Sequence, residues 1–143
     1  ELTVRPPIAV LQAMRGRFGE ARDLIAEVRT FLQELGLDWT VPLINWDCAE
    51  IERLAGDWSA AERELRVVYE THRQRGDQGH LASSAVQLAE VLVEQDHDDE
   101  ALRLTQISEA AADLDDIDAQ AGWRCVRGGP PSAWPSRRHG EAS

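Results

Sequence analysis

The sequence has 143 residues, of which 43% are hydrophobic, and this is enough for one domain with a buried core. Lys and Arg together number 15 against 26 Asp and Glu, so the formal net charge at pH 7 is −11. Because an acidic chain repels phosphate backbones and anionic lipid, nucleic acid and membrane surfaces are not expected partners.

The sequence shows the pattern of neither a transmembrane helix nor a secretion signal. There is no run of about 18 apolar residues, as a transmembrane helix requires, and the start ELTVRPP lacks the basic and apolar regions of a secretion signal. We therefore expect a cytoplasmic protein. The chain begins without Met, and RRHGEA at 137–142 echoes RGRFGEA at 15–21, so we also expect a piece of a longer protein.

The reactive residue types are few. All basic residues are arginine, so the chain has no lysine for a Walker-type phosphate loop, a Schiff base or a lysine general base. Cys48 and Cys125 are far apart and belong to no C-x-x-C motif, which argues against a disulfide framework or a zinc knuckle. We interpret Cys48 as a buried free thiol that packs as a small hydrophobic residue.

Residues 55–70, AGDWSAAERELRVVYE, predict a turn followed by a helix. Gly56 permits a backbone conformation with φ > 0, and Ser59 with Glu62 fits the S-x-x-E capping box. The apolar residues that follow have the spacing of one helix face: Ala61, Leu65 and Val68.

The same pattern of a turn and a helix recurs 40 residues earlier and 40 residues later in the sequence. The later copy is degenerate. The earlier copy is Gly16, Phe18, Ala21, Ile25 and Val28. The later copy is Asp96, Asp98, Ala101, Thr105 and Ser108. We interpret the chain as a repeat protein built from pairs of helices.

Six helices follow from the apolar spacing and from the glycines that end it. We expect them at about 7–15, 17–35, 42–55, 59–75, 81–95 and from Asp98 or Asp99 onward, and the pattern allows a seventh at 117–126. The fifth is apolar almost all round, which predicts that neighbours cover it on several sides. The expected domain is 1–127, with repeats at about 7–36, 42–76 and 81–115 and the start of a fourth at 117–127. Residues 128–143 are expected to be irregular.

The pattern Gly16-Phe18-Ala21 and Gly56-Trp58-Ala61 resembles the tetratricopeptide repeat, although its period of 40 exceeds the usual ~34 residues. Small residues in the preceding helices, Ala9, Ala49 and Ala89, match that repeat as well. The resemblance implies an all-α fold: a right-handed α-solenoid of antiparallel helix pairs, with three repeats and a disrupted fourth.

The amino-acid sequence of residues 8–127 is similar to the helical-repeat region of large bacterial signalling ATPases, of the nucleotide-cyclase-linked or transcription-regulator type. The resemblance implies a non-catalytic module that binds a protein or another domain of its own chain, and in which the first helix of each pair lines a groove. The expected groove residues are Trp46, Glu50, Arg53, Val86, Glu90 and Val93. The alternative for these residues is packing against a neighbouring repeat that is not part of this sequence.

Two further functions were weighed against this interaction module. One is a small-molecule sensor with Trp46, Trp58 or Trp123 in a pocket between repeats. The other is an enzyme, which we do not expect, and we expect no cofactor or metal. We interpret the acidic run 96–100 as helix capping, and His72, His80 and His139 as isolated surface residues. With only three helix pairs, we expect an isolated chain that is marginally stable or self-associates through its ends.

Overall fold

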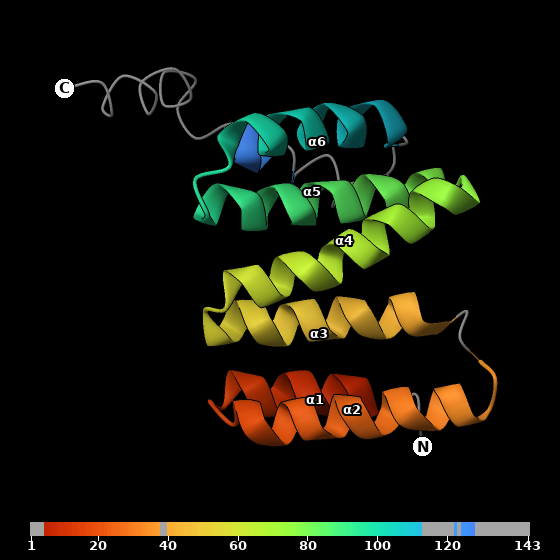
Figure 1. The fold of residues 1–143 in the computed structure, drawn as a ribbon. Coiled ribbons are helices and arrows are strands. Elements are labelled where there is room, and N and C mark those ends of the chain that lie inside the picture. Colours follow the sequence, from red (N-terminus) through yellow and green to blue (C-terminus); the bar gives the residue numbers. More distant parts are fainter. Residues whose placement is uncertain (1–4, 38–39, 113–121, 123, 128–143) are drawn as a thin grey trace. The chain divides into compact units, whose positions relative to one another are not determined.

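The computed structural model describes residues 5–37, 40–112, 122 and 124–127, and the regular structure in these residues is α-helical (Figure 1). Residues 122 and 124–127 are helical as well. Within the described residues, no helix is long and apolar enough to cross a membrane. The elements are α1 Arg5–Met14, α2 Phe18–Glu34, α3 Val41–Ala55, α4 Trp58–Arg75, α5 Gln78–Glu94 and α6 Asp98–Ala111.

The six helices predicted from the sequence are all present, and their bounds differ only slightly from the predicted ones. The predicted seventh helix is described only at its C-terminal part, and residues 117–121 and 123 lie outside the described residues. The segment 128–143, predicted to be irregular, lies outside them too.

The turns between the helices share one backbone conformation. A residue with positive φ, between 60° and 78°, recurs at equal intervals along the chain, at Gly16, Gly36, Gly56, Gly76 and Asp96. At each turn the following residue donates its N–H to the carbonyl five positions back, over 2.9 to 3.1 Å, which is the bond of the Schellman motif. The repeat of the sequence is therefore a repeat of turn geometry, and its unit is one helix with its turn.

The cap of α4 differs from the predicted capping box. The Asp57 carboxylate accepts the Ala60 N–H at 2.9 Å, so Asp57 is the side-chain cap. Ser59 lies inside the helix, where its hydroxyl is 3.4 Å from the Arg63 guanidinium, and Glu62 pairs with Arg66. The prediction was wrong because the turn ends at Asp57, so the helix begins two residues before the position that a Ser59 cap requires.

The start of α6 also differs from the prediction. Its N-cap is His97, which makes no side-chain capping bond, while Asp98, Asp99 and Glu100 lie within the first turn. Carboxylates there are still favourable, because they lie near the positive end of the helix dipole. The N-cap position is therefore His97 rather than the predicted Asp98 or Asp99.

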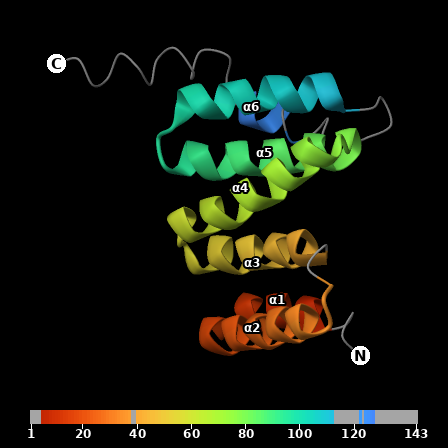
Figure 2. The same ribbon diagram turned by 45° about the vertical axis from the view of Figure 1, so that its right-hand side comes forward.

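The chain divides into two compact units after Thr71, within α4. In the first unit α1 packs against α2 and α3, and α2 packs against α3 (Figure 2). Alanines with no exposed surface let the helices approach closely. The shared core of these three helices consists of Ala9, Ala13, Ala21, Ile25, Val28, Ile44, Cys48 and Ile51.

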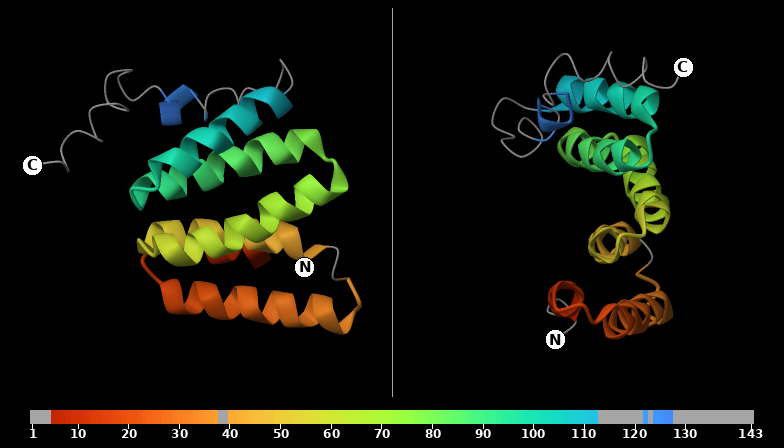
Figure 3. Two further views of the ribbon diagram at one scale, coloured as in Figure 1. Left: turned by 45° about the horizontal axis from the view of Figure 1, so that its top comes forward. Right: turned by 90° about the vertical axis from the view of Figure 1, so that its left-hand side faces the viewer.

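In the second unit α5 packs against α6 (Figure 3). Nine residues of α5 are buried, which confirms that neighbours cover it on several sides. Residue 122 lies on Val86, since a Cβ at Gly122 would be 2.8 Å from a Val86 methyl carbon. Arg127 bonds to the Thr105 hydroxyl at 2.9 Å and pairs with Glu109 at 2.6 Å, so this segment is attached to α6.

Two buried serines in the second unit are expected to respond in opposite ways to removal of the hydroxyl. Ser108 has no exposed surface, and its Oγ has no hydrogen-bond partner among the described residues, whereas the equally buried Ser84 donates to the Leu81 carbonyl at 3.1 Å. A buried hydroxyl without a partner costs ~1 kcal/mol or more. Ser108→Ala should therefore raise the free energy of unfolding by about 1 kcal/mol, and Ser84→Ala should lower it by about 0.5–1 kcal/mol. Urea unfolding of both variants checks this, and changes of equal sign would contradict it.

Candidate functional site

The predicted groove residues of the first unit lie on α3. Trp46, Glu50 and Arg53 follow one helix face and are half-buried. Glu50 and Arg53 form an ion pair at 3.6 Å, one turn apart. This face presents an aromatic ring beside a local charge pair.

The predicted groove residues of the second unit lie on α5. Glu90 and Val93 are half-buried, but Val86 is only 4% exposed because residue 122 packs on it. Val86 is therefore not an exposed groove position. The segment beside Val86 belongs to this chain, so the alternative of packing against a repeat outside the sequence stays a prediction.

A polar cluster joins three helices of the first unit. The Arg29 guanidinium of α2 donates to the Asn45 side-chain oxygen at 3.0 Å, to the Cys48 sulfur at 3.2 Å and to Glu64 of α4 at 3.2 Å. Burial, followed by the charge of Glu64, raises the pKa of Cys48 to about 12. The thiol stays protonated at neutral pH. Cys48 is free and buried, which confirms its interpretation as a buried free thiol.

A cavity of about 160 Å³ adjoins this cluster. Ligand pockets usually measure about 300–1,000 Å³, so this one is small. Its charged groups already bond to one another, with Arg22 holding Glu52 through two bonds of 2.8 and 2.6 Å. Neither Trp46 nor Trp58 lines the cavity, and Trp123 lies outside the described residues. This cavity does not favour the sensor hypothesis.

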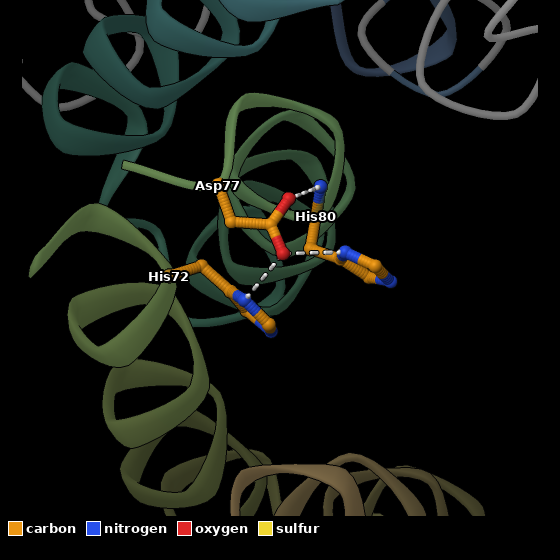
Figure 4. A group of neighbouring side chains, drawn as sticks. All are labelled: His72, Asp77 and His80. Atoms are coloured by element: carbon orange, nitrogen blue, oxygen red, sulfur yellow. Dashed lines mark hydrogen bonds and ion pairs between the residues drawn. The ribbon is translucent and has the colours of Figure 1, made fainter. Parts of the chain in front are cut away.

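A second cluster lies at the turn between α4 and α5, where His72, Asp77 and His80 meet (Figure 4). His72 is in the last turn of α4, Asp77 is the N-cap of α5, and His80 is in the first turn of α5. One Asp77 oxygen, Oδ2, is 2.8 Å from Nδ1 of His80 and 3.6 Å from Nδ1 of His72. Both imidazole rings therefore converge on one carboxylate oxygen.

The turn explains why two histidines on successive helices meet. Gly76 has φ +67°, which reverses the chain, and His72 and His80 stand four residues before and after it. Their rings stack with centroids 5.0 Å apart and planes inclined by 16°. His72 is 4% exposed, so the α4 side of the cluster is held by packing.

The protonation states follow from burial and charge. Burial, and next the neighbouring His80, lower the pKa of His72, so at neutral pH its imidazole is uncharged. Burial alone would raise the pKa of Asp77, but hydrogen bonds from the backbone and ring of His80 outweigh it, and the net pKa is lowered. The cluster thus offers imidazole nitrogen and ionised carboxylate, the donors that many transition-metal sites use.

Sequence reasoning missed this cluster. It predicted that His72 and His80 are isolated surface residues. This is wrong, because His72 is buried and the two rings stack on each other. The equal spacing of the two histidines about Gly76 was the signal that could have revealed it. The acidic run 96–100 forms no comparable group in the part of the chain that the structure describes.

No protein-family model matches the chain, and no curated protein or solved structure matches it either. The class that the fold defines is an all-helical protein of packed helices joined by one repeated turn. The likeness to tetratricopeptide repeats and to bacterial signalling ATPases stays a prediction from the sequence.

Proposed function

We propose that this protein is a non-catalytic helical-repeat module, of the α-solenoid type, that binds a protein partner through the apolar face of α1. One observation carries the proposal. Ile8 and Leu11 of α1 are 40% and 53% exposed, whereas their counterparts one period later, Cys48 and Ile51 of α3, are 8% and 1% exposed. The same repeat positions are thus open on α1 and covered on α3.

The covered face of α3 indicates what would cover α1. Cys48 and Ile51 share a buried cluster with Ile25 and Val28, which belong to α2, the second helix of the preceding pair. The corresponding residues of α5, Leu88 and Val91, are buried as well. The partner that fits α1 is therefore a helix with two branched aliphatic residues three positions apart.

A polar contact at the edge of the α2–α3 interface indicates one further feature of the partner helix. Glu52 accepts both bonds from Arg22, which stands three residues before Ile25. Gln12 occupies the equivalent position on α1, and its Oε1 is buried without a hydrogen-bond partner among the described residues. A basic residue three positions before the first aliphatic residue of the partner helix would lie beside Gln12, and rotation of the Gln12 side chain would let Oε1 accept a bond from it. The net charge of −11 also favours a basic partner.

The proposal keeps the repeat groove as a second contact surface. Each unit contributes its own set of predicted groove residues, which are Trp46, Glu50 and Arg53 on α3 of the first unit and, separately, Glu90 and Val93 on α5 of the second. The tetratricopeptide resemblance supports this part of the proposal. That resemblance and the composition alone support a role in a cytoplasmic bacterial signalling or transcription regulator.

A peptide with the sequence of residues 17–37, which carries Arg22, Ile25 and Val28, tests the α1 surface. We expect the labelled peptide to bind the full chain with a Kd of about 1–100 μM, and Leu11→Ser to weaken binding about tenfold. Leu43→Ser is the matched control, because Leu43 is 54% exposed on α3 and should not matter. Fluorescence anisotropy measures all three affinities.

Equal binding by the wild type and the Leu11→Ser variant would contradict the α1 assignment. Light scattering of the free protein shows whether a second copy occupies this face instead. A thermal-shift panel of small molecules tests the sensor alternative, which a ligand-induced stabilisation without peptide binding would favour over the module.

A further inference from the structure

We propose that His72, Asp77 and His80 bind one divalent transition-metal ion, for which zinc is the matching probe. The proposal does not rest on the partner-binding role of α1. All three residues belong to the second unit, and they lie within one short stretch of chain around Gly76.

The separations of the donor atoms suit such an ion. One donor atom from each residue lies within 4.8 Å of the other two. Zinc sites with bonds of about 2.0–2.2 Å in tetrahedral geometry place their ligand atoms roughly 3.4 Å apart. The two distances from Asp77 Oδ2, 2.8 Å to His80 and 3.6 Å to His72, bracket that spacing. The His80 ring is nearly parallel to that of His72, so it would have to turn for both rings to point a nitrogen at the ion.

One of the three metal-binding side chains is buried and held in place, and the other two are exposed enough to change conformation. The His72 side chain is 6% exposed and held by packing, whereas those of Asp77 and His80 are 39% and 59% exposed. Asp77 and His80 can therefore close on an ion beside His72. Three protein ligands leave a position for water, on the side where His80 faces solvent.

The two oxygens of Asp77 have separate tasks, so metal binding does not compete with helix capping. Oδ1 accepts the His80 backbone N–H at 3.2 Å and caps α5. Oδ2 faces the imidazole nitrogens and is the oxygen available to a metal. An ion bound to Oδ2 and to Nδ1 of His80 would replace the 2.8 Å contact between these two atoms.

The donor set selects the class of ion. Two imidazole nitrogens and one carboxylate suit zinc and its first-row neighbours. Calcium and magnesium prefer oxygen ligands throughout, so they are expected to bind far more weakly.

Isothermal titration of the full chain with zinc chloride, in a buffer that does not chelate metals, tests the proposal. We expect one zinc per chain, and His80→Ala and Asp77→Asn should each weaken binding about tenfold or more. Asparagine caps helices well, so Asp77→Asn removes the charge and keeps the cap. His97→Ala is the control, because His97 is an exposed histidine at the equivalent turn before α6, and it should leave the affinity unchanged.

A second readout separates binding from folding. Zinc should raise the midpoint of thermal unfolding of the wild type and of His97→Ala, but not that of His80→Ala. His80 is exposed, so its replacement should leave the circular dichroism spectrum intact. Absence of zinc binding at about 100 μM, or equal affinity of the wild type and His80→Ala, would overturn the site.

Discussion

Replacing Leu65 with alanine is expected to lower the free energy of unfolding by about 3 kcal/mol. Leu65 has no exposed surface, and it lies on the face of α4 that also carries the fully buried Ala61 and Val68. The truncation removes apolar contacts and leaves a cavity that the surrounding helices can fill only in part. Urea unfolding followed by far-UV circular dichroism measures the loss.

Val67→Ala on the same helix is the matched control. Val67 is 47% exposed, so its truncation should change the free energy of unfolding by no more than about 0.5 kcal/mol. Equal losses for Leu65→Ala and Val67→Ala would mean that the burial pattern of α4 is wrong.

The second large effect is expected at the turn before α4, where Gly56→Val should cost about 2 kcal/mol of unfolding free energy. Gly56 has φ +76°, a conformation that a β-branched residue strongly disfavours. Apart from Gly56 and its adjoining backbone, nothing lies within 4 Å of a Cβ placed at this position, so the cost comes from the backbone conformation rather than from a clash. Thermal and urea unfolding of the variant check the value.

The equivalent turn before α6 gives a test of opposite sign. Asp96 holds φ 60° without being glycine, so Asp96→Gly should raise the free energy of unfolding by up to about 1 kcal/mol. A destabilising Asp96→Gly, or a neutral Gly56→Val, would show that the positive φ does not control these turns.

The helices could be predicted because their signals are local. The apolar spacing of Ala61, Leu65 and Val68 and the recurring glycines act within one helix and its turn, and the structure follows them closely. The capping box failed for a local reason too. Asp57 and Ser59 are both good N-cap residues, and the preceding Gly56 turn decides between them by fixing where the helix begins.

The candidate sites were less accessible to sequence reasoning, because they depend on segments that meet in space. Val86 has the spacing of a groove residue, yet residue 122, from a later segment of the chain, covers it. Ile8 and Leu11 have the spacing of an apolar helix face, and the sequence does not show that this face is exposed while that of Cys48 and Ile51 is buried. The solenoid arrangement of the repeats stays a prediction.

The even spacing of the positive-φ residues has a consequence for how such a chain changes length. Every turn ends with the same bond from the residue after the positive-φ position, and each following helix except α3 begins one residue later. Excision of residues 37–76, for example, would place Asp77 directly after Gly36 and recreate a turn of the kind already present at Gly76. Gain or loss of one whole helix pair therefore needs no new loop, and the matching of helix faces alone limits it.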